Sequence, residues 1–160
     1  MAIQIVGCRP QLGIRLRHAV SPHLAAKWAG VSIDIQALPK PEGSGWIVEG
    51  AGGFLVPIND HTLMADFIRL LDLPALIVAR SGLGTINHTL LTLEAARARR
   101  LAVAGVVLCR AAATAGADEP TNPDAIAAYG RVPVLGLFPH GDDADAVADR
   151  VLAQIQPRAR

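Results

Sequence analysis

The sequence has few aromatic residues and almost no net charge. Aromatic side chains make up 4% of the 160 residues, too few for the stacking surfaces that bind single-stranded nucleic acid. Lysine and arginine together number 15, aspartate and glutamate number 14, and the formal net charge is +1. Nucleic-acid binding usually needs a basic surface, and this balance does not predict one. We therefore expect no nucleic-acid partner.

Cysteines and long apolar runs are also scarce. Cys8 and Cys109 are the only cysteines, and two cysteines do not build a disulfide framework. No apolar run reaches the roughly 20 residues that a membrane span needs. The first ten residues are too interrupted for a secretory signal. These features favour a cytoplasmic protein without a membrane partner.

The lysine-bearing loop that many nucleotide-binding proteins use is missing. The pattern Gly-x-x-x-x-Gly-Lys-Ser/Thr binds phosphates through its backbone and its lysine, and it occurs nowhere in the chain. The only lysines are Lys27 and Lys40, and neither follows a glycine-rich turn.

The composition that remains is that of a globular protein. Apolar residues make up 51% of the sequence and charged residues 18%, which excludes a disordered or charged low-complexity chain. The length suits one compact domain. We expect a single domain over residues 1–160, with an atypical, basic first part (1–20) and a regular core (21–157).

Short apolar runs alternate with segments of helical period over most of the chain. Strands are predicted at 46–48, 75–79, 104–108 and 134–137, and helices at 22–29, 62–71, 85–100, 122–130 and 144–156. The second strand is continuously apolar, as if buried on both faces. Asn122 is the expected cap of its helix. The alternation predicts an α/β fold with a parallel sheet and helices on both faces.

Apolar residues 147, 151, 152 and 155 share one face of the last predicted helix. The run Ile3-Gln4-Ile5-Val6 is a further candidate strand. Ser21 and Pro22 form a typical helix start, and Gly30 a typical helix end.

The first candidate site follows the strand at 46–48. In parallel sheets, ligands bind beyond the carboxyl ends of the strands. Glu49 stands there, where nucleotide-binding sheets hold Mg²⁺ on an acidic residue. Gly50, Ala51, Gly52 and Gly53 let the backbone approach a ligand and direct N–H groups towards anionic oxygens. The alternative is an ordinary glycine-rich turn with a solvated glutamate.

The second candidate site is the segment from Ser81 to His88. Its glycines lead from a strand into a helix start, where unpaired N–H groups favour a phosphate or a carboxylate. It is not a dinucleotide-binding fingerprint, because Asn87 stands where the third glycine belongs. Asn87 and His88 are placed to orient a ligand, although His88 also fits an ordinary helix position.

The third candidate site comprises the residues that follow the last two predicted strands. Cys109 and Arg110 follow one of them, and Pro139, His140 and Gly141 follow the other, so they are placed to line a pocket for a base or ring. Cys109 also fits a small core residue. His18 and His23 lack the companions of a metal site.

Two long segments resemble one enzyme family. Residues 48–57 (VEGAGGFLVP) and 74–92 (PALIVARSGLGTINHTLLT) are similar to the signature segments of dethiobiotin synthetase, in the same order. Residues 21–26, 133–136 and Pro139 also resemble that family. The resemblance runs from Ser21 to about Gly141.

The resemblance implies a cytoplasmic, homodimeric enzyme with a P-loop NTPase-like α/β fold. Such an enzyme uses ATP, Mg²⁺ and CO₂ to close the ureido ring of dethiobiotin on 7,8-diaminononanoate. An amino group first forms a carbamate, ATP phosphorylates the carbamate, and the second amine displaces phosphate. This chemistry depends mainly on positioning and on neutralising phosphoryl charge.

The resemblance also implies roles for individual residues. Glu49 is the expected Mg²⁺ ligand, and Gly50, Ala51, Gly52 and Gly53 face the nucleotide and the carbamate. Thr85, Ile86, Asn87 and His88 receive the substrate carboxylate across the dimer. Pro139, His140 and Gly141 lie along the adenine, and Cys109 stands where the family places an adenine-reading asparagine.

The family's phosphate-binding loop, its two functional lysines, its substrate-binding serine and a further Mg²⁺-binding aspartate have no counterpart here. We therefore assign no catalytic residue and expect a fold truncated at its N-terminus that is incomplete alone. The alternative is a non-catalytic paralogue that acts as a binding or dimerisation module. An amidotransferase or partitioning relative is disfavoured by Ile86-Asn87-His88.

Overall fold

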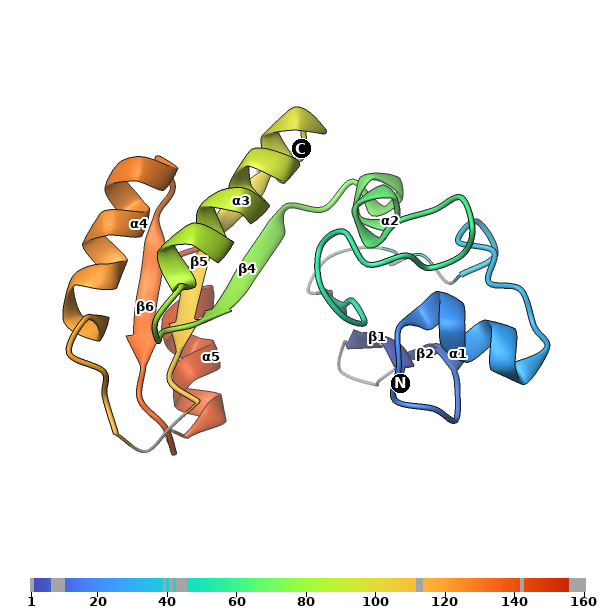
Figure 1. The fold of residues 1–160 in the computed structure, drawn as a ribbon, viewed down its shortest axis with the longest axis horizontal. Coiled ribbons are helices and arrows are strands. Elements are labelled where there is room, and N and C mark those ends of the chain that lie inside the picture. Colours follow the sequence, from blue (N-terminus) through green and yellow to red (C-terminus); the bar gives the residue numbers. More distant parts are fainter. Residues whose placement is uncertain are drawn as a thin grey trace. The chain divides into compact units, whose positions relative to one another are not determined.

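The computed structural model describes residues 2–6, 11–38, 40, 42, 46–111, 114–141 and 143–155. The chain divides into two compact units, Met1–Leu73 and Pro74–Arg160 (Figure 1). The boundary falls directly before the strand predicted at 75–79.

The first unit is an antiparallel sheet with two helices. Its strand order is β2-β1-β3, and β1 pairs antiparallel with both neighbours. The elements are β1 (Ala2–Val6), β2 (Gln11–Arg15), α1 (Pro22–Ala29), β3 (Ile47–Glu49) and α2 (Met64–Leu71).

The pairing of β3 differs from the prediction. Ile5 faces Val48 and Val6 faces Ile47 in an antiparallel ladder, whereas the alternation of strands and helices predicted parallel neighbours. The physical reason is that the chain folds back after β1 to pair β2 antiparallel with it before it forms α1 and β3, so β1 and β3 are not the two ends of a simple strand–helix–strand unit. The candidate strand at residues 3–6 is confirmed, as the centre of this sheet.

The ends of α1 agree with the sequence signals. Pro22 is the first helical residue, and Gly30 ends the helix in the left-handed conformation with φ +67°. The Ser21 side chain makes no capping hydrogen bond. Beneath the two helices lies a core that includes Ala26, Ile33, Leu38, Ile58 and Phe67.

The second unit has a three-stranded parallel sheet of order β4-β5-β6. Its elements are β4 (Ala75–Arg80), α3 (Thr85–Ala98), β5 (Val103–Cys109), the 3₁₀ turn η1 (Glu119–Thr121), α4 (Asn122–Gly130), β6 (Val134–Phe138) and α5 (Ala144–Leu152). Helices α3 and α4 cover one face and α5 covers the other (Figure 1). The predicted α/β fold is confirmed here.

The alternation of side chains along β5 supplies both layers of this core. Val106 and Leu108 are fully buried and pack with Ile126 of α4, whereas Val107 packs with Phe138 and Val151 on the α5 side. A strand in the middle of a sheet covered on both faces is expected to be apolar throughout.

Four local predictions are wrong. β4 is not buried on both faces, because the core beneath α5 contains no β4 residue and leaves Leu76 and Val78 38% and 65% exposed. Leu152 is exposed, since α5 ends there. Asn122 is the first residue of α4 rather than its cap, because the turn η1 runs directly into the helix and places Thr121 at the cap. The helix predicted over 144–156 ends earlier, at Leu152, and residues 153–154 form a turn.

None of the helices in the described parts of the chain is both long enough and apolar enough to cross a membrane.

The exposed face of β4 leads to a prediction about self-association. In the part of the chain that the structure describes, β4 has a partner strand on one side only, and open apolar edge strands pair with other chains. We expect the purified chain to self-associate and Val78→Lys to reduce the average mass measured by light scattering. Tyr129→Lys, at another exposed position, is the control. A monomeric wild type, or an equal effect of both substitutions, contradicts the prediction.

Candidate functional site

The loop after β3 has a conformation that glycine permits and other residues resist. Glu49 ends the strand with an exposed side chain. Gly50 lies against α2, where an added Cβ would stand 2.8 Å from Met64 Sδ. Gly52 has φ +86°, a region that L side chains rarely adopt. The sequence Gly50-Ala51-Gly52-Gly53 therefore fixes a compact turn directly beyond the carboxylate.

Hydrogen bonds hold this loop against both helices of the first unit. The N–H of Val56 donates to Gly53 O at 3.0 Å, and the N–H of Met64 donates to Val56 O at 2.9 Å. The N–H of His23 in α1 donates to Pro57 O at 3.3 Å. Ala51, Gly52 and Gly53 donate no backbone hydrogen bond to any described residue. The loop is thus held by backbone hydrogen bonds on one side; Ala51 is buried in the core, and Gly52 and Gly53 are exposed.

The glycine loop offers a metal ion one carboxylate, that of Glu49. Across the described residues, no group of three or more His, Cys, Asp or Glu could hold a metal ion, so the site is not a cage made by protein alone. Mg²⁺ typically takes one or two carboxylates and completes its shell with water and substrate phosphates. The exposed Glu49 carboxylate, next to backbone N–H groups that donate to no described residue, suits that arrangement.

The second candidate segment forms an exposed helix start. Gly84 caps α3 in the left-handed conformation with φ +89°. The N–H of Thr85 bonds to Gly82 O at 3.1 Å, and that of His88 bonds to Gly84 O at 3.1 Å. An ideal Cβ on Gly84 would lie 3.5 Å from Cε1 of His88, so the imidazole packs beside the cap.

The side chains in the first turn of α3 divide between the core and the surface. Thr85 is buried and Ile86 packs against the sheet, whereas Asn87 and His88 are exposed. Among the described residues, the buried hydroxyl of Thr85 has no hydrogen-bond partner. The helix dipole and the unpaired N–H groups favour an anion here. Asn87 and His88 are therefore placed where a carboxylate would bind.

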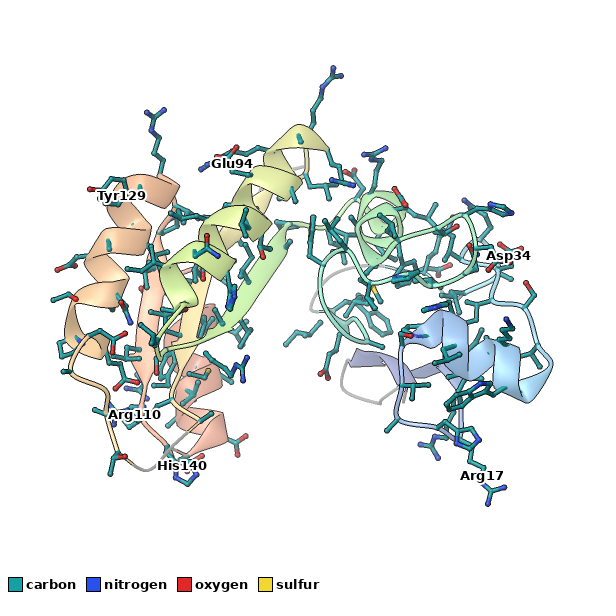
Figure 2. The ribbon with its side chains drawn as sticks, in the orientation of Figure 1. Arg17, Asp34, Glu94, Arg110, Tyr129 and His140 are labelled. Atoms are coloured by element: carbon teal, nitrogen blue, oxygen red, sulfur yellow. The ribbon has the colours of Figure 1, made fainter. Side chains whose placement is uncertain are left out.

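The third candidate segment lies at the same edge of the parallel sheet as α3's start. The N–H of Ser81 donates to Cys109 O at 3.0 Å, and the N–H of Arg110 donates to Phe138 O at 2.9 Å. Figure 2 shows Arg110 and His140 at the same end of the second unit. Pro139, His140 and Gly141 follow β6 with exposed positions.

Cys109 belongs partly to the core. It is half-buried and packs against the cluster of Val107, Phe138 and Val151 on the α5 side. Burial raises the pKa of its thiol, which keeps the sulfur protonated and weakly nucleophilic.

A buried carboxylate that the sequence did not indicate joins these strand ends. Glu119, in the turn η1, is 2% exposed. Its Oε1 accepts a hydrogen bond from Ser81 Oγ. Its Oε2 lies 2.6 Å from both Nε and Nη2 of Arg110. Asn122 Nδ2 donates to Ser81 O at 2.8 Å and completes the network.

The pKa of Glu119 is lowered, first by the hydrogen bond from Arg110, then by that from Ser81, while burial acts in the opposite direction. The sequence carries only a weak signal for this network. Arg110 follows a strand directly and Glu119 stands nine residues later in a loop of small residues, a spacing that does not by itself predict an ion pair.

The second unit therefore brings together three of the predicted segments, namely Thr85–His88, Cys109 and Pro139–Gly141. The loop of Glu49 belongs to the first unit, and its participation in one common site stays a prediction, as do the ligand roles of all these residues.

Comparison with known proteins identifies the family. Residues 10–148 match the model of a family described as an AAA domain. The chain belongs to this AAA domain family. The P-loop NTPase-like fold predicted from the sequence is thereby confirmed.

Relatives of this AAA domain chain carry names from biotin biosynthesis. The ATP-dependent dethiobiotin synthetase BioD of Lawsonia intracellularis is 44% identical over 123 residues, which are 77% of this chain and 58% of that protein. BioD of Paramagnetospirillum magneticum is 45% identical over 139 residues, 86% of this chain and 57% of that protein. The biotin biosynthesis bifunctional protein BioCD of Bordetella avium is 46% identical over 134 residues, 83% of this chain and 28% of that protein.

The resemblance to dethiobiotin synthetases is confirmed by these matches. The chain spans less than two thirds of the length of each of these relatives.

The backbone of the glycine loop gives a prediction about stability. Gly52→Ala places a side chain at φ +86° with Cβ 3.1 Å from Val56 Cγ1, so we expect a loss of about 1–2 kcal/mol in the free energy of unfolding. Gly53→Ala is the control, because nothing lies within 4 Å of a Cβ there and φ is not positive. Urea denaturation measures both variants. Equal stability of the two would contradict the described loop.

The lowered pKa of Glu119 predicts a dependence of stability on pH. Because its pKa in the folded protein lies below the ordinary 4.5, its contribution is complete above that value and is lost as the pH falls through the lowered one. We expect acidification from about pH 7 to about pH 3 to reduce the unfolding free energy more in the wild type than in Glu119→Gln. Urea denaturation across that range measures this difference, and parallel pH profiles would refute it.

Proposed function

We propose that this chain takes part in the ATP- and Mg²⁺-dependent closure of the ureido ring on 7,8-diaminononanoate with CO₂, the dethiobiotin synthetase reaction of biotin biosynthesis. Relatives named for that activity are 40–47% identical over about 80% of the chain. The observation that carries the proposal is the open start of α3, with Asn87 and His88 exposed beside the left-handed cap Gly84.

The start of α3 is suited to the substrate carboxylate. In the first turn the N–H groups of Ile86 and Asn87 donate no backbone hydrogen bond to a described residue, and the dipole places partial positive charge there. The amide of Asn87 and the ring of His88 can donate hydrogen bonds to carboxylate oxygens. Binding the carboxylate at this point would hold the chain of the substrate and present its amino groups at a fixed distance.

The loop of Glu49 is suited to the phosphate end of the nucleotide. Glu49 would hold Mg²⁺, and the N–H groups of Ala51, Gly52 and Gly53, which donate no backbone hydrogen bond to a described residue, would donate to phosphoryl or carbamate oxygens. The ion, when bound, neutralises charge on the transferring phosphoryl group. The bracing of this loop by α1 and α2 keeps its donors in place as that charge develops.

We assign the binding of the adenine base to the residues at the ends of β5 and β6. Pro139, His140 and Gly141 offer an exposed backbone segment next to Cys109 and Arg110. The half-buried thiol of Cys109 is a weak hydrogen-bond donor and acceptor. We therefore expect recognition of the base to be weaker than a carboxamide would give at the same position.

A homodimer through α3 is part of the proposal. Leu83 is 94% exposed and Leu91 is 60% exposed, and Leu91 lies one turn beyond Asn87 on the same helix face. A second copy packed on this face would cover both leucines and bring the first turn of α3 close to the partner's ligand. A cytoplasmic location also belongs to the proposed function.

The second candidate function is a non-catalytic binding or dimerisation module. The absence of a lysine after any glycine-rich turn favours it, since loss of one electrostatic stabiliser of the transition state typically costs about 10²–10³ in rate. We accordingly expect this chain alone to form no dethiobiotin above background.

Titration calorimetry with 7,8-diaminononanoate tests the proposed function. We expect the wild type to bind and Asn87→Ala to lose roughly tenfold or more in affinity, because the amide hydrogen bond to the carboxylate is lost. Glu94→Ala, at an exposed position on the same helix, is the control and should bind like the wild type. Absence of binding by the wild type, or equal affinities of all three proteins, would refute the role of α3.

A product assay with ATP, Mg²⁺ and CO₂ then tests whether this chain is active alone. Turnover by the purified chain would overturn the expectation that it is incomplete alone and would exclude the non-catalytic module. Binding of the diamine without turnover agrees with the proposal.

A further inference from the structure

A single buried carboxylate connects the ends of β4 and β5 with the start of α4. Glu119 accepts hydrogen bonds from Ser81, the residue after β4, and from Arg110, the residue after β5. Ser81 is 1% exposed and Glu119 is 2% exposed. The carboxylate therefore lies inside the second unit, although its partners border the candidate ligand segments.

The residues that contact Glu119 are part of the predicted ligand segments or are hydrogen-bonded to them. Ser81 is the first residue of the candidate segment that runs to His88 at the start of α3. Cys109 precedes Arg110, and its carbonyl accepts from the N–H of Ser81 at 3.0 Å. The N–H of Arg110 holds Phe138 O at 2.9 Å, one residue before Pro139. One network thus sets the spacing of all three segments.

The donors to the buried Glu119 carboxylate must keep fixed positions around it. A buried carboxylate is tolerated only where donors compensate for lost hydration. Glu119 has two nitrogen donors from one guanidinium and a hydroxyl donor from Ser81. Such contacts to a charged acceptor are short and directional. Displacing Arg110 would leave a buried charge unpaired, and displacing Ser81 would leave Oε1 without its donor, so the strand ends are held in one arrangement.

We propose that Glu119 is a positioning residue, which holds the carboxylate-binding start of α3 and the nucleotide-side ends of β5 and β6 in register through Ser81 and Arg110. The proposal rests on the proposed function for the identity of the ligands. Glu119 itself touches no ligand, and it acts through the two residues that it binds.

The ion pair on the surface of α3 offers a matched comparison. Glu94 and Arg97 are 3.5 Å apart, and their side chains are 74% and 42% exposed. Exposed pairs of this kind contribute little to stability. Glu94→Gln thus removes the same charge from the same unit without disturbing the strand ends.

The first test is the affinity for 7,8-diaminononanoate of the full chain and two variants. We expect Glu119→Gln to weaken binding roughly tenfold or more, since small displacements of a positioned group have effects of this size. Glu94→Gln should bind as the wild type does. A merely structural role would instead leave the affinity of the folded fraction unchanged, and that result overturns the proposal.

A second test does not depend on the ligand. Amide hydrogen exchange should become faster in Glu119→Gln at Ser81, Thr85 and Arg110, whose N–H groups donate hydrogen bonds at this edge. Amides of Val106 and Leu108 in the core of the same unit should stay protected. Faster exchange throughout the unit, or no change at the three edge amides, overturns the proposal. If the wild type fails to bind the diamine but the local change is seen, the proposed function fails and the positioning role stands.

A double-mutant cycle checks that the effect passes through Arg110. Glu119→Gln and Arg110→Gln should each change exchange at the edge amides, and the double variant should change it no more than the larger single effect, because both remove one contact. Additive changes would show that Arg110 and Glu119 act separately and would contradict the proposal. Should Glu119→Gln fail to fold, Ser81→Ala, which removes only the hydroxyl donor, takes its place in both tests, with the same outcomes.

Discussion

The ion pair between Glu119 and Arg110 is the interaction on which the carboxyl edge of the second unit depends. The carboxylate is 2% exposed and has donors from two strand ends. An isolated buried carboxylate would be unstable, so the network is complete or it does not form. Because β4, β5 and α4 meet at this point, one pair sets the spacing of the exposed loops beyond them.

The first unit holds its candidate ligand loop in place by backbone geometry and not by an ion pair. Its glycine loop has no buried charge, and it depends on a left-handed Gly52 and on close packing of Gly50 against Met64. Backbone hydrogen bonds to α1 and α2 support the loop from behind. Both units therefore present N–H donors beyond the end of a strand, one from a braced turn and one from a helix start. Anions are the ligands that both arrangements favour.

Most of the elements could be predicted from sequence periodicity, because the parallel strands and amphipathic helices of the second unit are local patterns. The start and end of α1 followed from Pro22 and Gly30 for the same reason. The antiparallel pairing of β3, the exposed face of β4 and the network of Glu119 depend on contacts between distant segments, which a single sequence does not display. The candidate ligand segments were visible because glycines and polar residues stand directly beyond strands. Their common edge in the second unit is set by parallel pairing.

The central claim is that the start of α3 binds the substrate carboxylate and that the loop of Glu49 binds Mg²⁺ and phosphate. Nuclear magnetic resonance of the ¹⁵N-labelled chain tests it most directly, by following amide shifts during separate additions of 7,8-diaminononanoate and of ATP with Mg²⁺. The account predicts that the diamine shifts Gly84, Thr85, Ile86 and Asn87, and that the nucleotide shifts Gly50, Ala51, Gly52 and Gly53. Shifts confined to other residues, or no shifts with either ligand, would contradict it.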